Sequence, residues 1–324
     1  MSGTPAHRLL AVIVNYRTAE LAAEAARALL AEIGDWPHAR VVIVDNCSKD
    51  GSMEILGSAI LQAPLKGKVR LVESARNGGY GYGNNLALRA NLDGSDGGPR
   101  ADYYYLLNPD AFPRPGAVRT LVEFLAATPH AGIAGSYIEG PDGTPHHTAF
   151  RFPSLGSELE AGLALGLASR LLADWVVPLP IPERRCQVDW LAGASMLIRR
   201  QVLETVGLFD EEFFLYYEEV DLCRRALQAG FPTYYLRDSV VTHIGSVSTG
   251  MKETGRRMPR FWFDSRRHYL RKHHGVGYQR ACDLAYAAGR GLWEVRRRLQ
   301  RKPDSGPPRL WWDFVRHSLR GSIE

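Results

Sequence analysis

Leu9-Leu10-Ala11-Val12-Ile13-Val14 decides the fold, because it is an unbroken apolar run with β-branched members. Such a run is typical of a strand that is covered on both faces, as in a parallel sheet. Arg40 to Val44 repeats the pattern, and an alanine-rich segment from Ala19 to Ile33 separates the two runs. Val69 to Val72 is a third run of this kind. Strands that alternate with helices predict right-handed crossovers, so we expect an α/β fold with a doubly wound, mostly parallel sheet flanked by helices.

Polar residues follow the first two predicted strands directly. Asn15 and Arg17 come after the first strand, and Asp45 comes after the second. In doubly wound sheets, ligands bind at the carboxyl ends of the strands. Asp45 is therefore a candidate to accept hydrogen bonds from the base or ribose of a nucleotide, with capping of the next helix as an equal alternative. The GxGxxG fingerprint is absent after the first strand, which argues against NAD or FAD.

A glycine-rich stretch follows the third predicted strand. Arg76 to Asn85 reads RNGGYGYGNN and has four glycines within six residues, which allow a ligand to approach the backbone closely. A helix predicted from Leu86 to Ala90 follows, so its N-terminus is placed to face a phosphate. A flexible loop is the alternative, but the tyrosines and the paired asparagines are unusual for a linker.

Two further positions are candidate metal ligands. The strand predicted from Tyr103 to Leu107 runs into Asn108-Pro109-Asp110, and a carboxylate at the end of a central strand suits Mg²⁺ or Mn²⁺. His243 ends a later predicted strand, although a lone histidine is more often structural.

Three carboxylates, Glu218, Glu219 and Asp221, follow the aromatic run from Phe213 to Tyr217. They begin a predicted helix that ends near Gly230, where acidic residues are ordinary capping groups. However, a carboxylate held against apolar rings has a raised pKa, which suits a general base. Both interpretations remain open on these residues alone.

The charge is distributed unevenly along the 324 residues, whose net charge is +5. Residues 251–324 contain 18 Lys and Arg but 7 Asp and Glu, a net +11, so the first 250 residues carry −6. The tail is predicted to form basic helices that contain tryptophans, which suit an anionic membrane surface. A solvated helical face is the alternative. Nucleic-acid binding is disfavoured because no motif for it occurs.

The cysteines and the hydropathy indicate the compartment. Four scattered cysteines form no CxxC pair, which is typical of a reducing cytosol. No signal pattern and no run of about 18 apolar residues occurs, so we expect a cytoplasmic protein, peripheral at the inner face of the cell membrane if its tail binds lipid.

Five blocks occur in a characteristic order: VIVNYRT (12–18), VDNCSKDGS (44–52), ARNGGYGYGNN (75–85), LLNPDAF (106–112), and GASMLIRR through FLYYEEVDLCRRALQAG (193–230). Together they resemble the inverting, GT-A-fold glycosyltransferases of family 2, in particular their bacterial rhamnosyltransferase-like branch. The resemblance covers about residues 8–250. It implies a GT-A domain over residues 1–250 and a basic helical C-terminal extension over residues 251–324.

The resemblance implies roles for these residues. Glu219 occupies the position of the catalytic base, where the family has Asp, with Glu218 and Asp221 as alternatives. Asn108 replaces the first acid of the family's DxD motif, which leaves Asp110 as the carboxylate ligand of a divalent metal, Mg²⁺ or Mn²⁺, with His243 as a further ligand. The implied nucleotide-sugar contacts are Asn15, Arg17, Asp45, Asn77, Gly78, Gly79, Asn85, Asn108 and Asp110.

The implied activity is transfer of a sugar from a nucleotide-diphosphate donor to a hydroxyl of a glycan or lipid-linked acceptor, in cell-surface polysaccharide synthesis. Subfamily likeness favours dTDP-L-rhamnose, while UDP- and GDP-sugars remain open. A nucleotidyltransferase of sugar-nucleotide metabolism and a non-catalytic carbohydrate-binding protein are the alternatives.

Overall fold

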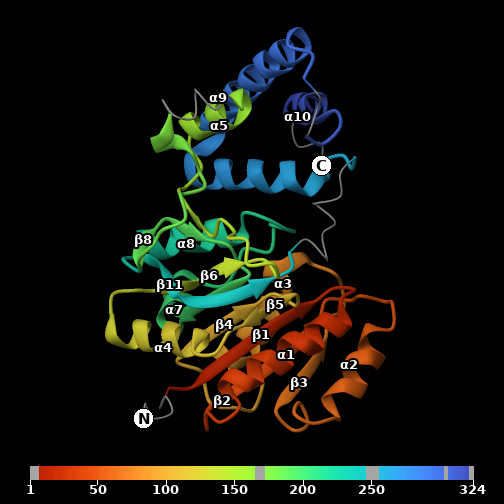
Figure 1. Ribbon diagram of the computed structural model, residues 1–324, viewed down its shortest axis with the longest axis vertical. Helices are drawn as coiled ribbons and strands as arrows, with labels where there is room; N and C mark the ends of the chain where they lie inside the picture. Colours follow the sequence, from red (N-terminus) through yellow and green to blue (C-terminus); the bar gives the residue numbers. More distant parts are fainter. Residues whose placement is uncertain (1–6, 165–171, 246–254, 303–305, 321–324) are drawn as a thin grey trace.

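A mixed, mostly parallel sheet forms the centre of the molecule (Figure 1). The structure is a computed structural model that describes residues 7–164, 172–245, 255–302 and 306–320. The strand order of the main sheet is β3-β2-β1-β4-β10-β6-β11-β5, with β8 paired to β11, and a small second sheet joins β7 to β9. The strands are β1 (Leu9–Asn15), β2 (Ala39–Asp45), β3 (Val69–Glu73), β4 (Tyr103–Leu107), β5 (Ala111–Pro113), β6 (Ile133–Glu139), β7 (Ala149–Phe150), β8 (Cys186–Val188), β9 (Trp190–Leu191), β10 (Ser195–Arg199) and β11 (Thr233–His243).

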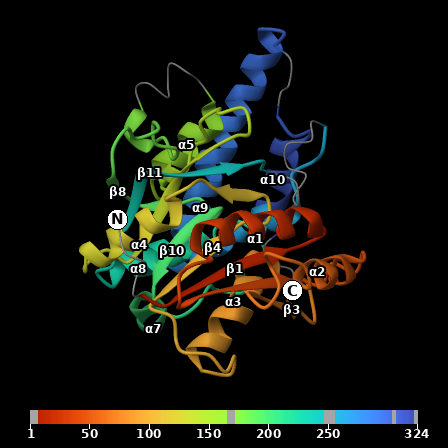
Figure 2. The same cartoon turned by 60° about the horizontal axis from the view of Figure 1, so that its bottom comes forward.

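Helices cover both faces of this sheet (Figure 2). The α-helices are α1 (Ala19–Ile33), α2 (Ser52–Ile60), α3 (Gly79–Leu92), α4 (Ala117–Ala127), α5 (Leu155–Leu163), α7 (Arg200–Val206), α8 (Glu218–Gln228), α9 (Arg260–Leu299) and α10 (Leu310–Leu319), and η1 (Ala173–Trp175) is a 3-10 turn. The predicted doubly wound α/β architecture is confirmed.

The alternation of side chains along β1 explains its unbroken apolar run. Leu9, Ala11 and Ile13 contact the core on the side of α1, α2 and α4. Leu10, Val12 and Val14 belong to a second core on the side of α3, α7 and α8. Because successive side chains of a strand point to opposite faces, a strand covered on both faces has no position for a polar residue.

The glycine-rich stretch differs from the prediction, because α3 begins at Gly79 and not at Leu86. A Cβ at Gly83 would lie 2.7 Å from Cγ1 of Val14, and Gly79 has φ +89° with its backbone against the carbonyl of Phe214. The glycines therefore permit close packing of the first turns of α3 against β1 and the loop before α8. After β7, α5 begins at a capping box on Ser154, and residues 165–171 lie outside the described part.

The C-terminal helices lie beyond one edge of the sheet layer, at the top of Figure 1. α9 bends at Gly275, where φ is 83°. Its buried Arg266 pairs with Glu158 of α5 at 2.8 Å and with Asp283 at 2.5 Å. A cluster of Phe213, Val220, Tyr269, Leu270 and Cys282 joins α9 to α8. Within the described residues, no helix is both long and apolar enough to cross a membrane.

Candidate active site

One cavity of about 820 Å³ gathers residues from both halves of the sheet. Its wall includes the ends of β1 and β4, the start of α3, the loop before α8 and the end of β11. It brings together Asn77, Gly79, Asn108, Asp110, His243, Glu218 and Glu219 from among the predicted site residues. It is not lined by Asn15, Arg17, Asp45, Gly78, Asn85 or Asp221.

At the ends of β1 and β2, the predicted residues Asn15, Arg17 and Asp45 do not line the cavity, and residues next to them in the sequence do. Nδ2 of Asn15 donates to Oδ1 of Asp45 at 2.7 Å, and the same carboxylate accepts from the hydroxyl of Ser48 at 2.6 Å. Both Asn15 and Asp45 are buried and hold the turn after each strand. Arg17 donates to the carbonyl of Ser48 at 3.3 Å. The residues that line the cavity here are Tyr16 and Asn46.

The amide of Asn46 holds the glycine-rich turn in place. Its Nδ2 donates to Oδ1 of Asn77 at 3.0 Å and to the carbonyl of Gly79 at 2.9 Å. Gly78 precedes α3, and a side chain there would collide with the ring of Tyr82. Asn85 lies farther along α3 and pairs with the backbone of Phe209 through both its nitrogen, at 2.9 Å, and its oxygen, at 3.1 Å. Asn85 therefore fastens the loop before α8 and does not reach the cavity.

Asp110 and His243 form a pair at the opposite wall. Nε2 of His243 lies 3.0 Å from Oδ1 of Asp110 and 3.4 Å from Nδ2 of Asn108, and the amide of Gly245 donates to Oδ2 of Asp110. Burial opposes ionisation of Asp110, but the hydrogen bonds and the His243 charge outweigh it, so the pKa of this carboxyl lies below its usual value.

This donor pair fits a divalent cation. Neighbouring ligand atoms around an octahedral ion with bonds of about 2.1 Å are about 3.0 Å apart, which matches the Asp110–His243 separation. Carboxylate oxygen and imidazole nitrogen both suit Mn²⁺. The described residues contain no group of three or more His, Cys, Asp or Glu side chains arranged for a metal.

Glu218 and Glu219 lie at the start of α8 with unsatisfied carboxyl oxygens. Oε2 of each is buried and has no hydrogen-bond partner within the described residues. Burial raises the pKa of Glu219 to about 7. Burial, together with the neighbouring Glu219 carboxylate, raises the pKa of Glu218 well above its usual value. Two adjacent buried carboxyls do not ionise together easily, so the pair titrates as a coupled unit in which both pKa values are raised.

The backbone before these glutamates is strained. Tyr216 and Tyr217 have φ values of 67° and 72°, which bulky residues rarely adopt. Phe214 and Tyr216 line the cavity, and Phe261 of α9 reaches the same wall. Strain of this kind persists only where surrounding contacts fix it, and it is typical of functional sites.

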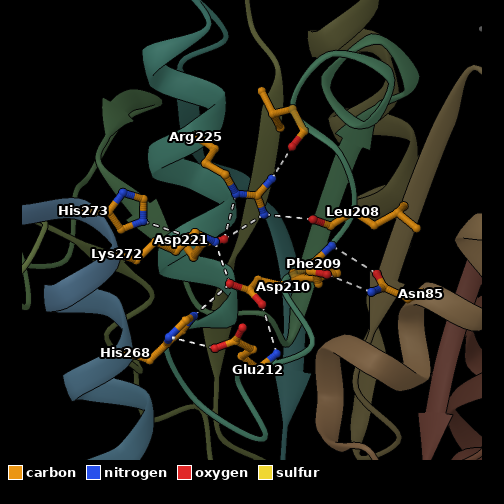
Figure 3. A network of polar contacts seen from close by, with 11 residues as sticks. Asn85, Leu208, Phe209, Asp210, Glu212, Asp221, Arg225, His268, Lys272 and His273 are labelled. Carbon is orange, nitrogen blue, oxygen red and sulfur yellow. Dashed lines mark hydrogen bonds and ion pairs between the residues drawn. The ribbon is translucent and has the colours of Figure 1, made fainter.

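Asp221 lies in an ion-pair network outside the cavity (Figure 3). Its Oδ1 contacts Nζ of Lys272 and Nε2 of His273, each at 2.8 Å, and its Oδ2 accepts from Nε of Arg225 at 2.8 Å. Lys272 also lies 2.7 Å from Oδ2 of Asp210. Burial opposes ionisation of Asp221, but these donors and cations outweigh it and lower its pKa. The network ties α9 to α8 and to the loop before α8.

Several cavity residues were not predicted from the sequence. Tyr80 donates its hydroxyl to the carbonyl of Gly193 at 2.7 Å and lies near Glu218 and Glu219, whose charges add to burial in raising its pKa. His146 and His147 come from the segment after β6. The paired histidines were a visible signal in a stretch otherwise interrupted by Pro and Gly, but nothing in the sequence placed them near His243, whose ring centroid lies 6.5 Å from that of His146.

Comparisons with known proteins show the family to which this chain belongs. The family described as "Glycosyltransferase like family 2" matches residues 5–264. The N-acetylglucosaminyl-diphospho-decaprenol L-rhamnosyltransferase of Mycobacterium tuberculosis is 33% identical over 219 residues, which are 65% of this chain and 68% of that protein. Rhamnosyltransferase WbbL of Escherichia coli is 28% identical over 159 residues, 49% of this chain and 58% of that protein.

Solved structures share the fold. A mannosyltransferase from Pyrobaculum calidifontis, in complex with GDP-Man and Mn²⁺, has a TM-score of 0.58 at 15% identity and covers 100% of this chain and 83% of its own. S. aureus TarS 1–349 with UDP-GlcNAc has a TM-score of 0.52 at 15% identity and covers 90% of this chain and 72% of its own.

The prediction of a transferase enzyme is confirmed, and the nucleotidyltransferase and the non-catalytic alternatives are set aside. The chain belongs to the family 2 glycosyltransferases, has the GT-A fold and is similar to rhamnosyltransferases.

Proposed function

We propose that this glycosyltransferase moves a sugar from a nucleoside-diphosphate donor to an acceptor hydroxyl with inversion at the anomeric carbon. The observation that supports this most is that one cavity holds a paired carboxylate and imidazole, Asp110 and His243, together with two carboxyls, Glu218 and Glu219, that each leave one oxygen unpaired. The first pair suits the charged leaving group, and the second suits removal of a proton.

Glu219 is the proposed base. With a pKa of about 7, its carboxylate is available at neutral pH and still basic enough to accept a proton. As that proton leaves the acceptor hydroxyl, the oxygen forms a bond to the anomeric carbon from the face opposite the leaving group. The bond between that carbon and the diphosphate oxygen breaks, and its electron pair leaves with the diphosphate.

Asp110 and His243 are the residues that would hold Mg²⁺ or Mn²⁺. Such a cation would offset the charge that develops on the leaving diphosphate. Nδ2 of Asn108 lies 3.4 Å from Nε2 of His243, so Asn108 would lie beside the cation.

The donor nucleotide is proposed to lie along the ends of β1 and β2. Tyr16, Asn46, Asn77 and Gly79 line this part of the cavity, while the buried Asn15–Asp45 pair and Arg17 hold the turns that present them. dTDP-L-rhamnose is the favoured donor because both named relatives above are rhamnosyltransferases, and a UDP-sugar is the second candidate.

A lipid-linked glycan is the proposed acceptor, in cell-surface polysaccharide synthesis. The support is that the M. tuberculosis relative is named for a diphospho-decaprenol acceptor. The C-terminal extension is proposed to hold the enzyme at an anionic membrane on its cytoplasmic side. Beyond the bend of α9, Leu284, Leu292, Val295 and Leu299 are exposed at helical spacing, next to Arg296–Arg298. An exposed apolar stripe flanked by arginines is typical of a helix that lies on a lipid surface.

The test is a donor screen with full-length protein and a polyprenyl-diphosphate-linked sugar. We expect release of nucleoside diphosphate that depends on acceptor, rises with Mn²⁺ and is lost in EDTA, and a product whose anomeric configuration is opposite to that of the donor by NMR. Retained configuration, or equal turnover in EDTA, would contradict the proposed mechanism.

A further inference from the structure

A second cavity of about 920 Å³ lies between α9 and α10, beside the loop before α8. Its lining is strongly basic, because six arginines face three carboxylates, those of Glu212, Asp264 and Asp313. The arginines are Arg257, Arg260, Arg267, Arg271, Arg316 and Arg320.

The three carboxylates already have partners. Asp313 accepts from Nε of Arg257 at 2.8 Å. Asp264 contacts His317 at 2.7 Å and Arg260 at 3.3 Å, and Glu212 lies 3.3 Å from His268. Among the described residues, Arg316 and Arg320 have no carboxylate partner. The cavity therefore keeps a surplus of positive charge.

Arg267 is the most informative of these side chains, because it is only 7% exposed. Its Nη2 lies 2.8 Å from Nδ1 of His317, and the same nitrogen donates to the carbonyl of His317. Burial is the largest cause of its lowered pKa, and the charges of Arg271 and Arg266 add to it, while those of Asp283 and Asp264 oppose it. Among the described residues no carboxylate pairs directly with Arg267, and a buried guanidinium is costly unless an anion compensates it.

The cavity is next to the active site. Arg260 and Asp264 line it, while Phe261, between them in the first turn of α9, lines the catalytic cavity. Glu212 belongs to the loop that continues into Glu218 and Glu219. The two cavities therefore lie on neighbouring faces of one helical turn.

Apolar side chains flank the arginines on the outer side of α10. Trp312 is 60% exposed and Leu319 is 81% exposed, and both share an exposed side of the helix with Arg316. A soluble anion needs no such neighbours, whereas an anionic group on a hydrocarbon chain is complemented by both kinds of residue.

We propose that the arginine-lined cavity between α9 and α10 binds the diphosphate of the lipid-linked acceptor, so that the acceptor sugar reaches Glu219 in the neighbouring cavity. Guanidinium groups bind phosphate oxygens in a bidentate manner, and Arg316 and Arg320 line this cavity without a carboxylate partner among the described residues. The proposal rests on the lipid-linked acceptor of the proposed function and assigns a place to its diphosphate.

The experiment is calorimetric titration of the full chain, in EDTA, with geranyl diphosphate, inorganic pyrophosphate and geraniol. We expect geranyl diphosphate to bind more tightly than pyrophosphate, and geraniol not to bind. Arg316→Gln with Arg320→Gln should weaken geranyl diphosphate binding by about tenfold or more. Arg298→Gln, an exposed arginine of α9 outside the cavity, is the matched control and should bind as the unaltered protein does.

His243→Ala separates this site from the donor site, because it alters only the catalytic cavity. Binding that is lost in His243→Ala, or kept in the Arg316/Arg320 double variant, would overturn the proposal. Binding to phosphatidylglycerol vesicles without binding to geranyl diphosphate would also overturn it and would assign the arginines to lipid headgroups. The titration measures binding and not turnover. If geranyl diphosphate binds as expected but the separate transfer assay shows no sugar transfer, the proposed function fails and the diphosphate site stands.

Discussion

Glu219 and Asp221 lie two residues apart in the first turn of α8, yet their surroundings are opposite. Asp221 is fully buried and contacts Arg225, Lys272 and His273, which lower its pKa. Glu219 has a buried oxygen that finds no partner among the described residues, and burial raises its pKa to about 7. Cationic partners from α9 therefore make Asp221 a structural group. Glu219 lacks such partners among the described residues and stays basic enough to accept a proton.

Replacing Glu219 is expected to have the largest effect. Glu219→Gln keeps the shape of the side chain but removes the proton acceptor, so turnover should fall about 100- to 10,000-fold while nucleotide binding is unchanged. Glu218→Gln is the matched control, since the proposed mechanism assigns no proton transfer to Glu218, and it should retain turnover to within about tenfold. Initial rates and nucleotide titrations on both variants check this; the reverse order of effects would make Glu218 the base.

Replacing the two proposed metal ligands, Asp110 and His243, should have the next largest effect. Asp110→Asn and His243→Ala each remove one of the two proposed metal ligands, so we expect turnover to fall about 100-fold and stimulation by Mn²⁺ to be lost. Rates measured across a Mn²⁺ titration check this, with Asp35→Asn, an exposed carboxylate of the α1–β2 loop, as the control. Normal Mn²⁺ stimulation in both variants would show that Asp110 and His243 do not bind the metal.

The same Glu219→Gln change should stabilise the fold at alkaline pH. The folded pKa of Glu219 is raised above its unfolded value, so its contribution to stability is present below about pH 4.5 and is lost as pH rises through about 7. Glutamine never ionises, so the variant should gain about 1–3 kcal/mol of unfolding free energy at pH 8 and almost none at pH 4.5. Denaturant unfolding at both pH values checks this, with the exposed Glu20→Gln as control. A loss of stability at pH 8 would mean that Glu219 has a partner in solution.

Breaking the ion-pair network around Asp221 should have the smallest effect. Lys272→Met removes the cation that bridges Asp210 and Asp221, while Arg225 and His273 remain on Asp221. We expect a loss of about 1–2 kcal/mol of unfolding free energy, with Lys66→Met on the surface as the control. The pKa values of both carboxyls are lowered in the folded state, so this loss should be full at neutral pH and should shrink as pH falls below about 4. A pH-independent loss would point to packing and not to charge.

The sheet was the part that the sequence predicted well. β1, β2 and β4 are buried on both faces, and burial of that kind requires the continuous apolar runs that were recognised. The glycine-rich stretch was harder, because the same four glycines suit a phosphate loop and close helix packing. Only the position of Val14 and Phe214 against α3 distinguishes the two.

The site residues were recognised by type but not by role. Glu218, Glu219 and Asp221 form one acidic block in the sequence, and their separation into unpaired and paired carboxyls depends on Lys272 and His273, about 50 residues later. The contacts of the basic tail could not be predicted from the sequence either. Its net charge was visible, but the burial of Arg266 between Glu158 and Asp283 depends on how α9 packs on α5.

The pH dependence of kcat/KM tests most directly the claim that an unpartnered, buried Glu219 is the base. The base must be ionised to accept a proton, so the account predicts that kcat/KM rises tenfold per pH unit on the acid side and levels off above a midpoint of about pH 7. Lys272→Met should leave this midpoint in place, because Asp221 takes no part in the chemistry. A flat profile between about pH 5.5 and 8.5 would contradict the account, since it would mean that the base is a carboxylate already ionised by its partners, as Asp221 is.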